Sequence, residues 1–116
     1  KTAVADFVDS LKSAGYAPNR TDIDPELTQY LERERIVKNL GDGVIFEIGN
    51  YESARDTVLE LLEKSNDSSL GVIRDALSTN RRITQALLET MDKEGLTARI
   101  GDGRKITERG RTLRGI

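Results

Sequence analysis

The sequence lacks the two side chains on which most enzyme and metal chemistry depends. Among its 116 residues there is no cysteine and no histidine. Without cysteine there are no disulfide bonds, thiolate metal ligands or thiol nucleophiles, which suits the reducing cytoplasm where we expect the protein to act. Without histidine, the usual general base and the commonest zinc ligand are missing. We therefore expect no enzymatic activity in this chain, with no catalytic residue, no bound metal and no cofactor.

Aromatic residues are also scarce, and all five lie within the first 51 residues. The basic carboxy-terminal half therefore has no aromatic platform of the RRM or OB type on which bases could stack. The phosphate-loop pattern GxxxxGK[ST] is absent as well, so nucleotide hydrolysis is not encoded here. No apolar run reaches eighteen residues and no signal-peptide pattern is present, which predicts a soluble protein without membrane contact. The start at Lys1, without Met, suggests a piece of a larger protein.

Near the carboxyl end, the residues that are present predict a helix followed by a β-hairpin. Asn80 is a helix-capping residue, Gly95 can end a helix in the left-handed conformation, and apolar residues recur between them at spacings of three and four. After Gly95, LTARI and RKIT flank the triplet Gly101-Asp102-Gly103, which predicts two short strands joined by a tight turn. A helix and hairpin in this order are typical of the recognition helix and wing of a winged helix-turn-helix.

Sliding the sequence by sixty residues reveals a second copy of this unit. Paired positions include Leu27 with Leu87, Leu31 with Met91, Ile36 with Leu96, Leu40 with Ile100, Gly41-Asp42-Gly43 with Gly101-Asp102-Gly103, and Phe46 with Ile106. We infer an internal duplication. The predicted fold class is α+β, mostly α, with two tandem winged helix-turn-helix domains at 1–50 and 51–116. We expect a monomer.

Further helices are predicted over residues 3–14, from the cap Asp24 onward, and over 51–64 and 70–77. The first copy has only ten residues, 15–24, where its second helix should be, so we expect that helix to be reduced to a turn. The sequence SNDS after residue 64 is interpreted as a turn. The residues after 106 are interpreted as a basic tail.

Charge is distributed unevenly, although the net charge is only −2. Residues 1–50 carry six basic and nine acidic side chains, whereas residues 98–116 carry six basic and two acidic ones. This polarity favours a polyanionic partner at the carboxyl end. The alternative is an ordinary solvated, charged tail.

The predicted recognition helices begin differently in the two copies. The first begins with Asp24-Pro25-Glu26, an acidic start that repels phosphate, whereas the second begins with Asn80-Arg81-Arg82. The start of the second helix combines free backbone amides, the positive end of the helix dipole and two guanidinium groups. This combination predicts a phosphate site. Alternatively, both arginines extend over the surface or pair with Asp75 or Glu89.

The wing adds further cations around its turn. On a two-residue period Arg104 and Lys105 point to opposite faces, so at least one of them points away from any given ligand. The candidate nucleic-acid-binding residues are Asn80, Arg81, Arg82, Gln85, Arg99, Gly101, Arg104 and Lys105.

The second copy also resembles a known family. Its motifs are Arg74-Asp75 on the second helix, Asn80-Arg81-Arg82 opening the third, and the two runs Leu-Leu-Glu-x-x-Asp from Leu87 and Thr-x-Arg-x-Gly-Asp-x-Arg from Thr97. These motifs are similar to the last winged helix of the selenocysteine-specific translation elongation factor SelB over about residues 51–106. Residues 1–50 resemble the preceding winged helix of that family more loosely.

The resemblance implies an RNA-binding module that recognises an mRNA hairpin, called SECIS, for selenocysteine incorporation at UGA codons. It implies that Arg81, Arg82, Arg99 and Arg104 contact the RNA. It also implies that GTP, selenocysteinyl-tRNA and the ribosome are partners of the full-length GTPase, which acts in protein biosynthesis. Two alternatives stay open: a winged-helix DNA-binding regulator, with Gln85 and Glu89 available for base readout, and a winged-helix protein-interaction module.

Overall fold

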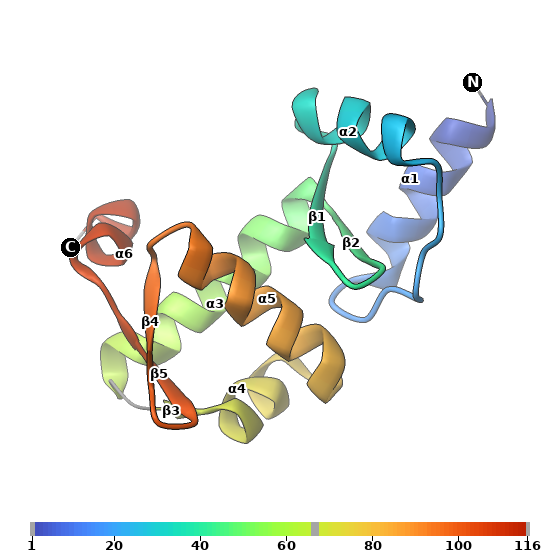
Figure 1. Ribbon diagram of the computed structural model, residues 1–116. Coiled ribbons are helices and arrows are strands. Elements are labelled where there is room, and N and C mark those ends of the chain that lie inside the picture. Colours follow the sequence, from blue (N-terminus) through green and yellow to red (C-terminus); the bar gives the residue numbers. More distant parts are fainter. Residues whose placement is uncertain (1, 66–67, 116) are drawn as a thin grey trace. The chain divides into compact units, whose positions relative to one another are not determined.

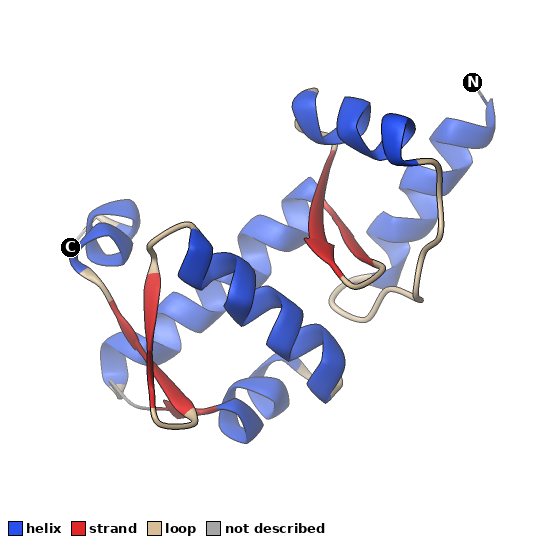
Figure 2. Ribbon diagram, viewed as in Figure 1, coloured by secondary structure: helices blue, strands red, loops and turns tan. Residues whose placement is uncertain are grey.

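The computed structural model describes residues 2–65 and 68–115. These residues divide into two compact units, Lys1–Ser53 and Ala54–Ile116, and each unit has its own small sheet. The boundary falls within one helix, α3 (Ile48–Lys64), which begins three residues before the predicted Tyr51. Figures 1 and 2 show the order of helices and strands along the chain.

Unit 1 is a helix–loop–helix followed by a hairpin. Its elements, ahead of the first residues of α3, are α1 (Thr2–Ala14), α2 (Pro25–Arg33), β1 (Val37–Gly41) and β2 (Val44–Glu47). Residues 15–24 contain no helix, as expected from the short interval. The α2 helix starts where predicted, because the Asp24 side chain accepts a hydrogen bond from the Glu26 amide and Pro25 occupies the first helical position. The core consists of Leu11, Leu31, Val37 and Ile45.

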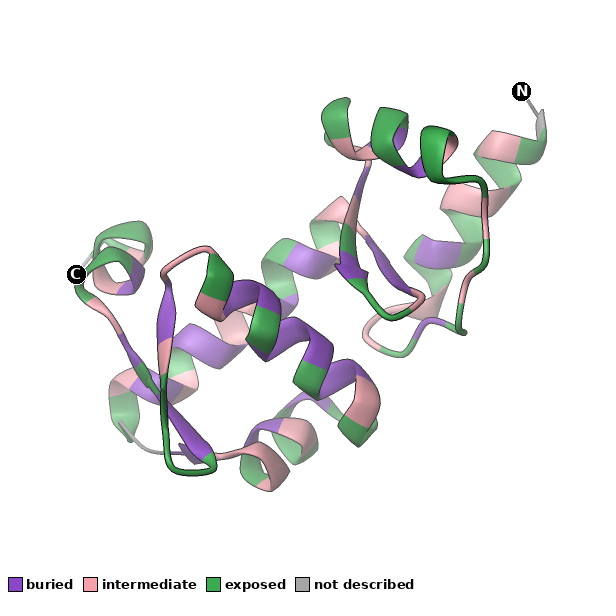
Figure 3. Ribbon diagram, viewed as in Figure 1, coloured by how far each residue is buried: buried purple, intermediate pink, exposed green. Residues whose placement is uncertain are grey.

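Unit 2 is a winged helix-turn-helix with a three-stranded sheet. After the carboxy-terminal part of α3, its elements are β3 (Ser68–Ser69), α4 (Leu70–Leu77), α5 (Arg81–Lys93), β4 (Thr97–Ile100), β5 (Gly103–Ile106) and α6 (Glu108–Arg114). The strand order is β3-β5-β4. The inward face of α5 is almost continuously buried, as Figure 3 shows.

Two elements of unit 2 correct the sequence interpretation. Ser68, interpreted as the end of a turn over residues 65–68, forms a short strand with Ser69 opposite Arg104 and Gly103, and residues 66–67 of that predicted turn lie outside the described residues. Two serines show no apolar alternation, so only the partner strand makes them a strand. The basic tail is largely a helix, because the Thr107 side chain caps its first turn by accepting from the Gly110 amide at 3.0 Å. Near the end of this helix, the Arg114 Nε lies 2.8 Å from a Glu63 carboxylate oxygen of α3, and this hydrogen bond raises the pKa of the Arg114 guanidinium.

The two copies coincide at the end of the recognition helix. The Ile36 amide donates to the Leu31 carbonyl at 2.9 Å, and the Leu96 amide donates to the Met91 carbonyl at 3.0 Å. The residue just after the helical cap has positive φ in both copies: 60° at Arg35 and 77° at Gly95. The sixty-residue relation therefore holds in three dimensions at this point.

Beyond the hairpin turn, the sixty-residue relation no longer pairs equivalent residues, because the strand registers of the two hairpins differ by one residue. Val37 lies opposite Glu47, whereas its counterpart Thr97 lies opposite Ile106, so Phe46 and Ile106 are not equivalent. The cause lies in the turns. The first hairpin has positive φ at both central residues, 54° at Asp42 and 74° at Gly43, the pattern of a type I′ turn, and a bulge precedes it. In the second, Gly101 has φ 60° at the first of two central positions, the pattern of a type II′ turn.

Arg35 is a strained counterpart of Gly95, because an L-residue rarely adopts positive φ. We expect Arg35→Gly to stabilise unit 1 by about 0.5–1 kcal/mol, since glycine removes the strain but adds freedom to the unfolded chain. Urea unfolding followed by tyrosine fluorescence measures this effect, because all three tyrosines lie in the first 51 residues. The control is Glu34→Gly at φ −82°, which should lose stability; a loss in both variants would contradict the assignment of strain to Arg35.

Candidate nucleic-acid interface

The amino-terminal end of α5 has an extra turn that unit 1 lacks. The α5 helix has 13 residues and α2 has 9, and their carboxyl ends coincide in the sixty-residue relation. The starts Asp24-Pro25-Glu26 and Asn80-Arg81-Arg82, compared as equivalents from sequence, are therefore not equivalent positions. Arg81 and Arg82 lie on a turn that has no counterpart in the first copy.

Asn80 caps this turn as predicted, with its Oδ1 accepting from the Ile83 amide at 2.9 Å. The amides that precede Ile83 in the first turn have no carbonyl partner within the helix. Arg81 is exposed and forms no hydrogen bond or ion pair through its side chain with any described residue, and Arg82 is half-buried. Of the two alternatives to a phosphate site, Arg81 extends over the surface and does not pair with Asp75 or Glu89: Asp75 pairs with Arg74 at 3.0 Å, and Glu89 accepts from Gln85 at 3.2 Å.

A groove of about 200 Å³ runs between α5, the wing and the start of α4. It brings together four of the predicted residues, and five further residues complete its lining; the full lining is Ser69, Leu70, Gly71, Arg81, Gln85, Glu89, Arg99, Asp102 and Arg104. We call it the α5–wing groove. The other predicted residues, Asn80, Arg82, Gly101 and Lys105, lie outside its lining. Sequence reasoning missed residues 69–71, because the pairing of β3 with β5 carries them there.

Arg104 is at the groove, but its charge is not available there. The Arg104 side chain is 4% exposed and forms a hydrogen-bonded ion pair with Asp92. Its Nε lies 3.1 Å from both Asp92 carboxylate oxygens, and its Nη2 lies 3.1 Å from Asp92 Oδ2. Arg104 lies opposite Arg99 as Ile45 lies opposite Asn39, so it occupies the strand position of a core isoleucine in unit 1. Because β5 directs this side chain inward, its guanidinium is not open to a phosphate, and Arg104 is the member of the Arg104–Lys105 pair that points away. Lys105, on the other face, is exposed.

Asp92 joins α5 to both strands of the wing. Its Oδ1 also accepts a hydrogen bond from the Thr97 hydroxyl of β4 at 2.6 Å. In unit 1 the equivalent acid, Glu32, accepts from the Asn39 amide of β1 at 3.0 Å. In both copies, an acid in the last turn of the helix holds the wing. The Asp92–Arg104 pair therefore sets the geometry of the α5–wing groove rather than its charge.

The open charges of the groove come from Arg81 on the helix and Arg99 on the wing. The Arg99 Nε donates to the Gly101 carbonyl at 3.1 Å, which holds the guanidinium beside the turn. Glu89 and Asp102 add carboxylates to the lining. The groove thus offers cations for phosphates together with amide and carboxylate groups for the polar edges of bases.

The corresponding groove of unit 1 has the opposite character. It encloses about 250 Å³ between α2 and the first hairpin, and its lining includes Asp22, Glu32 and Asp42, of which Asp42 pairs with Arg20 at 3.5 Å. Of the described residues that line it, none is basic. The same fold therefore carries an acidic groove in one copy and an arginine-containing groove in the other.

Comparisons with known proteins agree with this architecture. The family model described as "Elongation factor SelB, winged helix" matches residues 60–106. A solved structure of the mRNA-binding domain of elongation factor SelB from E. coli in complex with SECIS RNA aligns with a TM-score of 0.70 at 18% identity, covering 92% of this chain and 96% of that chain. A bacterial selenocysteine-specific elongation factor EF-Sec aligns with a TM-score of 0.63 at 21% identity over 74% of this chain.

This chain spans only 14% of the length of the EF-Sec chain. A search of curated protein sequences finds no match. Among the described helices, none has the length and apolar character needed to cross a membrane. The structural likenesses show the predicted mostly α, winged-helix fold, and the family match covers α4, α5 and both wing strands. Residues 60–106 of this chain are therefore similar to the winged helix of elongation factor SelB, and the chain as a whole has the winged-helix fold.

Proposed function

We propose that this chain is the RNA-binding part of a selenocysteine-specific elongation factor, and that its α5–wing groove binds an mRNA hairpin of the SECIS kind. The observation that carries the proposal is Arg81, an unpaired cation on the additional turn of α5 at the edge of the groove. The SelB domain solved with SECIS RNA has the same fold over 92% of this chain, which supports RNA as the ligand.

Phosphate recognition follows from the first turn of α5. Helix amides without internal partners, the positive end of the helix dipole and the Arg81 guanidinium converge there, and each favours an anion. Arg99 offers a second guanidinium from the wing. A hairpin loop can place its backbone between these two cations and turn an unstacked base toward Gln85 and Glu89.

The proposal divides the work between the two units. The acidic groove of unit 1 repels a phosphate backbone, so we assign unit 1 a supporting role. GTP, selenocysteinyl-tRNA and the ribosome are assigned to the rest of the full-length protein, a cytoplasmic GTPase in translation. The chain itself is proposed to act as a monomer without catalytic function.

The test compares an RNA hairpin with duplex DNA of equal length over a salt series. Three exposed cations of the predicted set remain for phosphates once the buried Arg104 and the half-buried Arg82 are excluded: Arg81, Arg99 and Lys105. Since each neutralised phosphate releases counterions, we expect a log–log salt slope of about −2 to −3 for the hairpin. Fluorescence anisotropy with labelled RNA measures it. Equal affinity for any duplex DNA would favour a DNA-binding regulator and overturn the proposal.

A further inference from the structure

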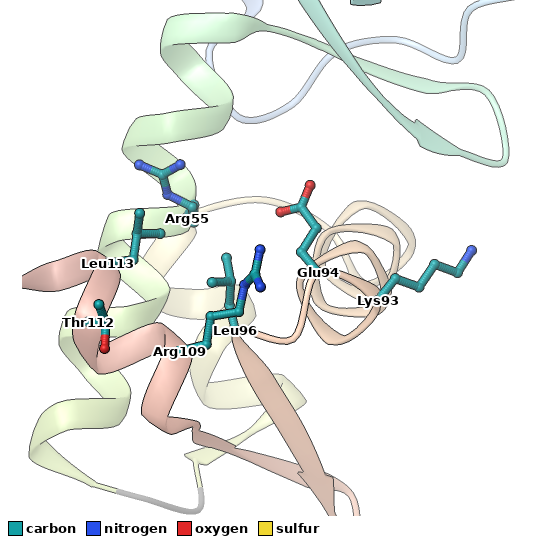
Figure 4. A pocket seen from close by; sticks show the side chains of 7 residues that line it. All are labelled: Arg55, Lys93, Glu94, Leu96, Arg109, Thr112 and Leu113. Atoms are coloured by element: carbon teal, nitrogen blue, oxygen red, sulfur yellow. The ribbon is translucent and has the colours of Figure 1, made fainter.

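A larger cavity lies at the other end of α5, and the proposed function does not use it. It measures about 540 Å³ and lies between the ends of α5 and β4, helix α6 and Arg55 of α3 (Figure 4). We call it the α6 pocket. We propose that it binds a nucleotide of a single-stranded RNA segment and so gives unit 2 a second RNA contact. This inference rests on the proposed function and extends it to RNA outside the hairpin.

Helix α6 is firmly attached, so the pocket is preformed. The Thr107 amide donates to the Leu96 carbonyl at 3.1 Å, and the Thr107 hydroxyl donates to the Gly95 carbonyl at 2.5 Å. Gly110 packs directly against the backbone at Leu96, because a Cβ at position 110 would lie only 2.4 Å from the Leu96 carbonyl oxygen. The Arg114–Glu63 ion pair holds the other end of α6 on α3. The backbone of α6 is therefore held in place before any ligand arrives.

The charges around the pocket favour an anion. Its lining contains three cations, Arg55, Lys93 and Arg109, and one carboxylate, Glu94. Arg55 already pairs with Asp56 at 3.1 Å, so Lys93 and Arg109 are the cations that can meet an anion. Arg109 is exposed and makes no hydrogen bond or ion pair through its side chain with any described residue. If residue 95 had a Cβ, that atom would lie 3.3 Å from the Arg109 Cδ. Figure 4 shows the Arg109 side chain extending from α6 beside Leu96. A glycine at position 95 leaves room for this arginine.

Helix carboxyl ends usually repel anions through their free carbonyls, but several carbonyls at this end already have donors. The Thr90, Met91 and Asp92 carbonyls accept from the amides of residues 94, 96 and 95. The Gly95 and Leu96 carbonyls accept from Thr107. An anion that binds the guanidinium groups is therefore repelled less strongly by the backbone carbonyls at this helix end.

The apolar part of the lining favours a nucleotide over a simple anion. Leu113 is 47% exposed although it is a large apolar residue, and it lines the pocket together with Leu96. A nucleotide has both a charged phosphate and a flat base, and bases stack on guanidinium planes when aromatic side chains are lacking. This combination matches a pocket with arginines and leucines and no aromatic residue.

One RNA can reach both sites. The α5 helix separates Arg81 from Lys93 by twelve residues, or about 18 Å at 1.5 Å per residue. A hairpin held at the α5–wing groove would keep its single-stranded flank near the α6 pocket at high effective concentration. We therefore expect flanking nucleotides to strengthen binding of the hairpin.

The experiment measures the dissociation constants of a bare hairpin and the same hairpin with a six-nucleotide uridine flank on either side. For the unchanged chain we expect the better flanked RNA to bind about five- to tenfold more tightly. Arg109→Ala should remove this gain and leave bare-hairpin affinity unchanged. Arg111→Ala is the matched control, since it removes the same charge from the same helix outside the pocket lining, and it should keep the gain. A flank gain that survives Arg109→Ala, or no gain in the unchanged chain, would overturn the inference.

A second measurement separates this inference from the proposed function. Titration of the chain with oligouridylate alone should shift the NMR amide signals of α6 more than those of the wing. If the hairpin fails to bind but these α6 signals still shift, the proposed function fails and the pocket assignment stands. If polyglutamate peptide shifts the α6 signals and displaces oligouridylate at equal concentration, the pocket is a site for acidic protein segments and the RNA assignment is wrong.

Discussion

Asp92→Ala is expected to destabilise unit 2 by about 3–5 kcal/mol, because it leaves the Arg104 guanidinium buried without a counter-charge. This is a large part of the stability of a small domain, so most of unit 2 should unfold under mild conditions. The opposite change, Arg104→Ala, should cost less. The Asp92 side chain is 28% exposed, against 4% for Arg104, so water can solvate the remaining carboxylate, which also keeps its bond to Thr97.

Urea unfolding with two probes measures this effect in the intact chain. Every aromatic residue lies in the first 51 positions, so tyrosine fluorescence follows unit 1, whereas far-ultraviolet circular dichroism follows both units. Asp92→Ala should lower the midpoint of the dichroism transition that comes from unit 2 and leave the fluorescence transition in place. Glu89→Ala is the control, because Glu89 is an exposed acid one turn earlier on α5 that, among the described residues, accepts a side-chain hydrogen bond from Gln85 alone. Equal losses for Asp92→Ala and Glu89→Ala would show that the buried pair does not hold the wing.

Arg81→Ala is expected to weaken hairpin binding by about 1–3 kcal/mol, or about 5- to 150-fold, while the fold stays intact. The reason is that Arg81 is the unpaired cation at the helix start, where an anion is best stabilised. The salt slope should become less steep by about one unit, since one phosphate contact is lost. Anisotropy titrations over the salt series give both numbers.

Two variants of unit 1 control for the Arg81 result. Arg33→Ala removes an exposed arginine of α2, and Glu26→Ala removes the acid from the first turn of that helix. Neither residue belongs to the α5–wing groove, so both variants should bind the hairpin as the unchanged chain does. Losses at Arg33 or Glu26 similar to that at Arg81 would refute the division of labour between the two units.

Features of this chain that depend on neighbouring residues are the ones that can be predicted from the sequence. The cap at Asn80, the end of α5 before Gly95 and the stripe of apolar residues between them depend on neighbours within one or two helical turns, and all three are present as predicted. The strand β3 and helix α6 were missed because their stability depends on distant partners. Ser68–Ser69 pairs with β5, and α6 is attached to Leu96 and Glu63.

Arg104 shows the same limit at the candidate site. Alternation along β5 indicated that Arg104 and Lys105 face opposite sides, and the structure shows one buried and one exposed. Which one faces inward depends on the register of the hairpin, and that register differs by one residue between two wings that share the triplet Gly-Asp-Gly. Turn type is decided by backbone angles at single residues, which the same three letters do not specify.

By itself, the sequence determined the class of fold, the duplication and the position of a basic helix start, because periodicity and capping are properties of short segments. Only the tertiary structure decided that α5 has an additional turn carrying Arg81, that Arg104 is bound to Asp92 and that a second cavity opens beside α6. Each of these results depends on pairings between segments far apart in the chain. Such pairings fix which charges are neutralised inside the protein and which remain open to a ligand.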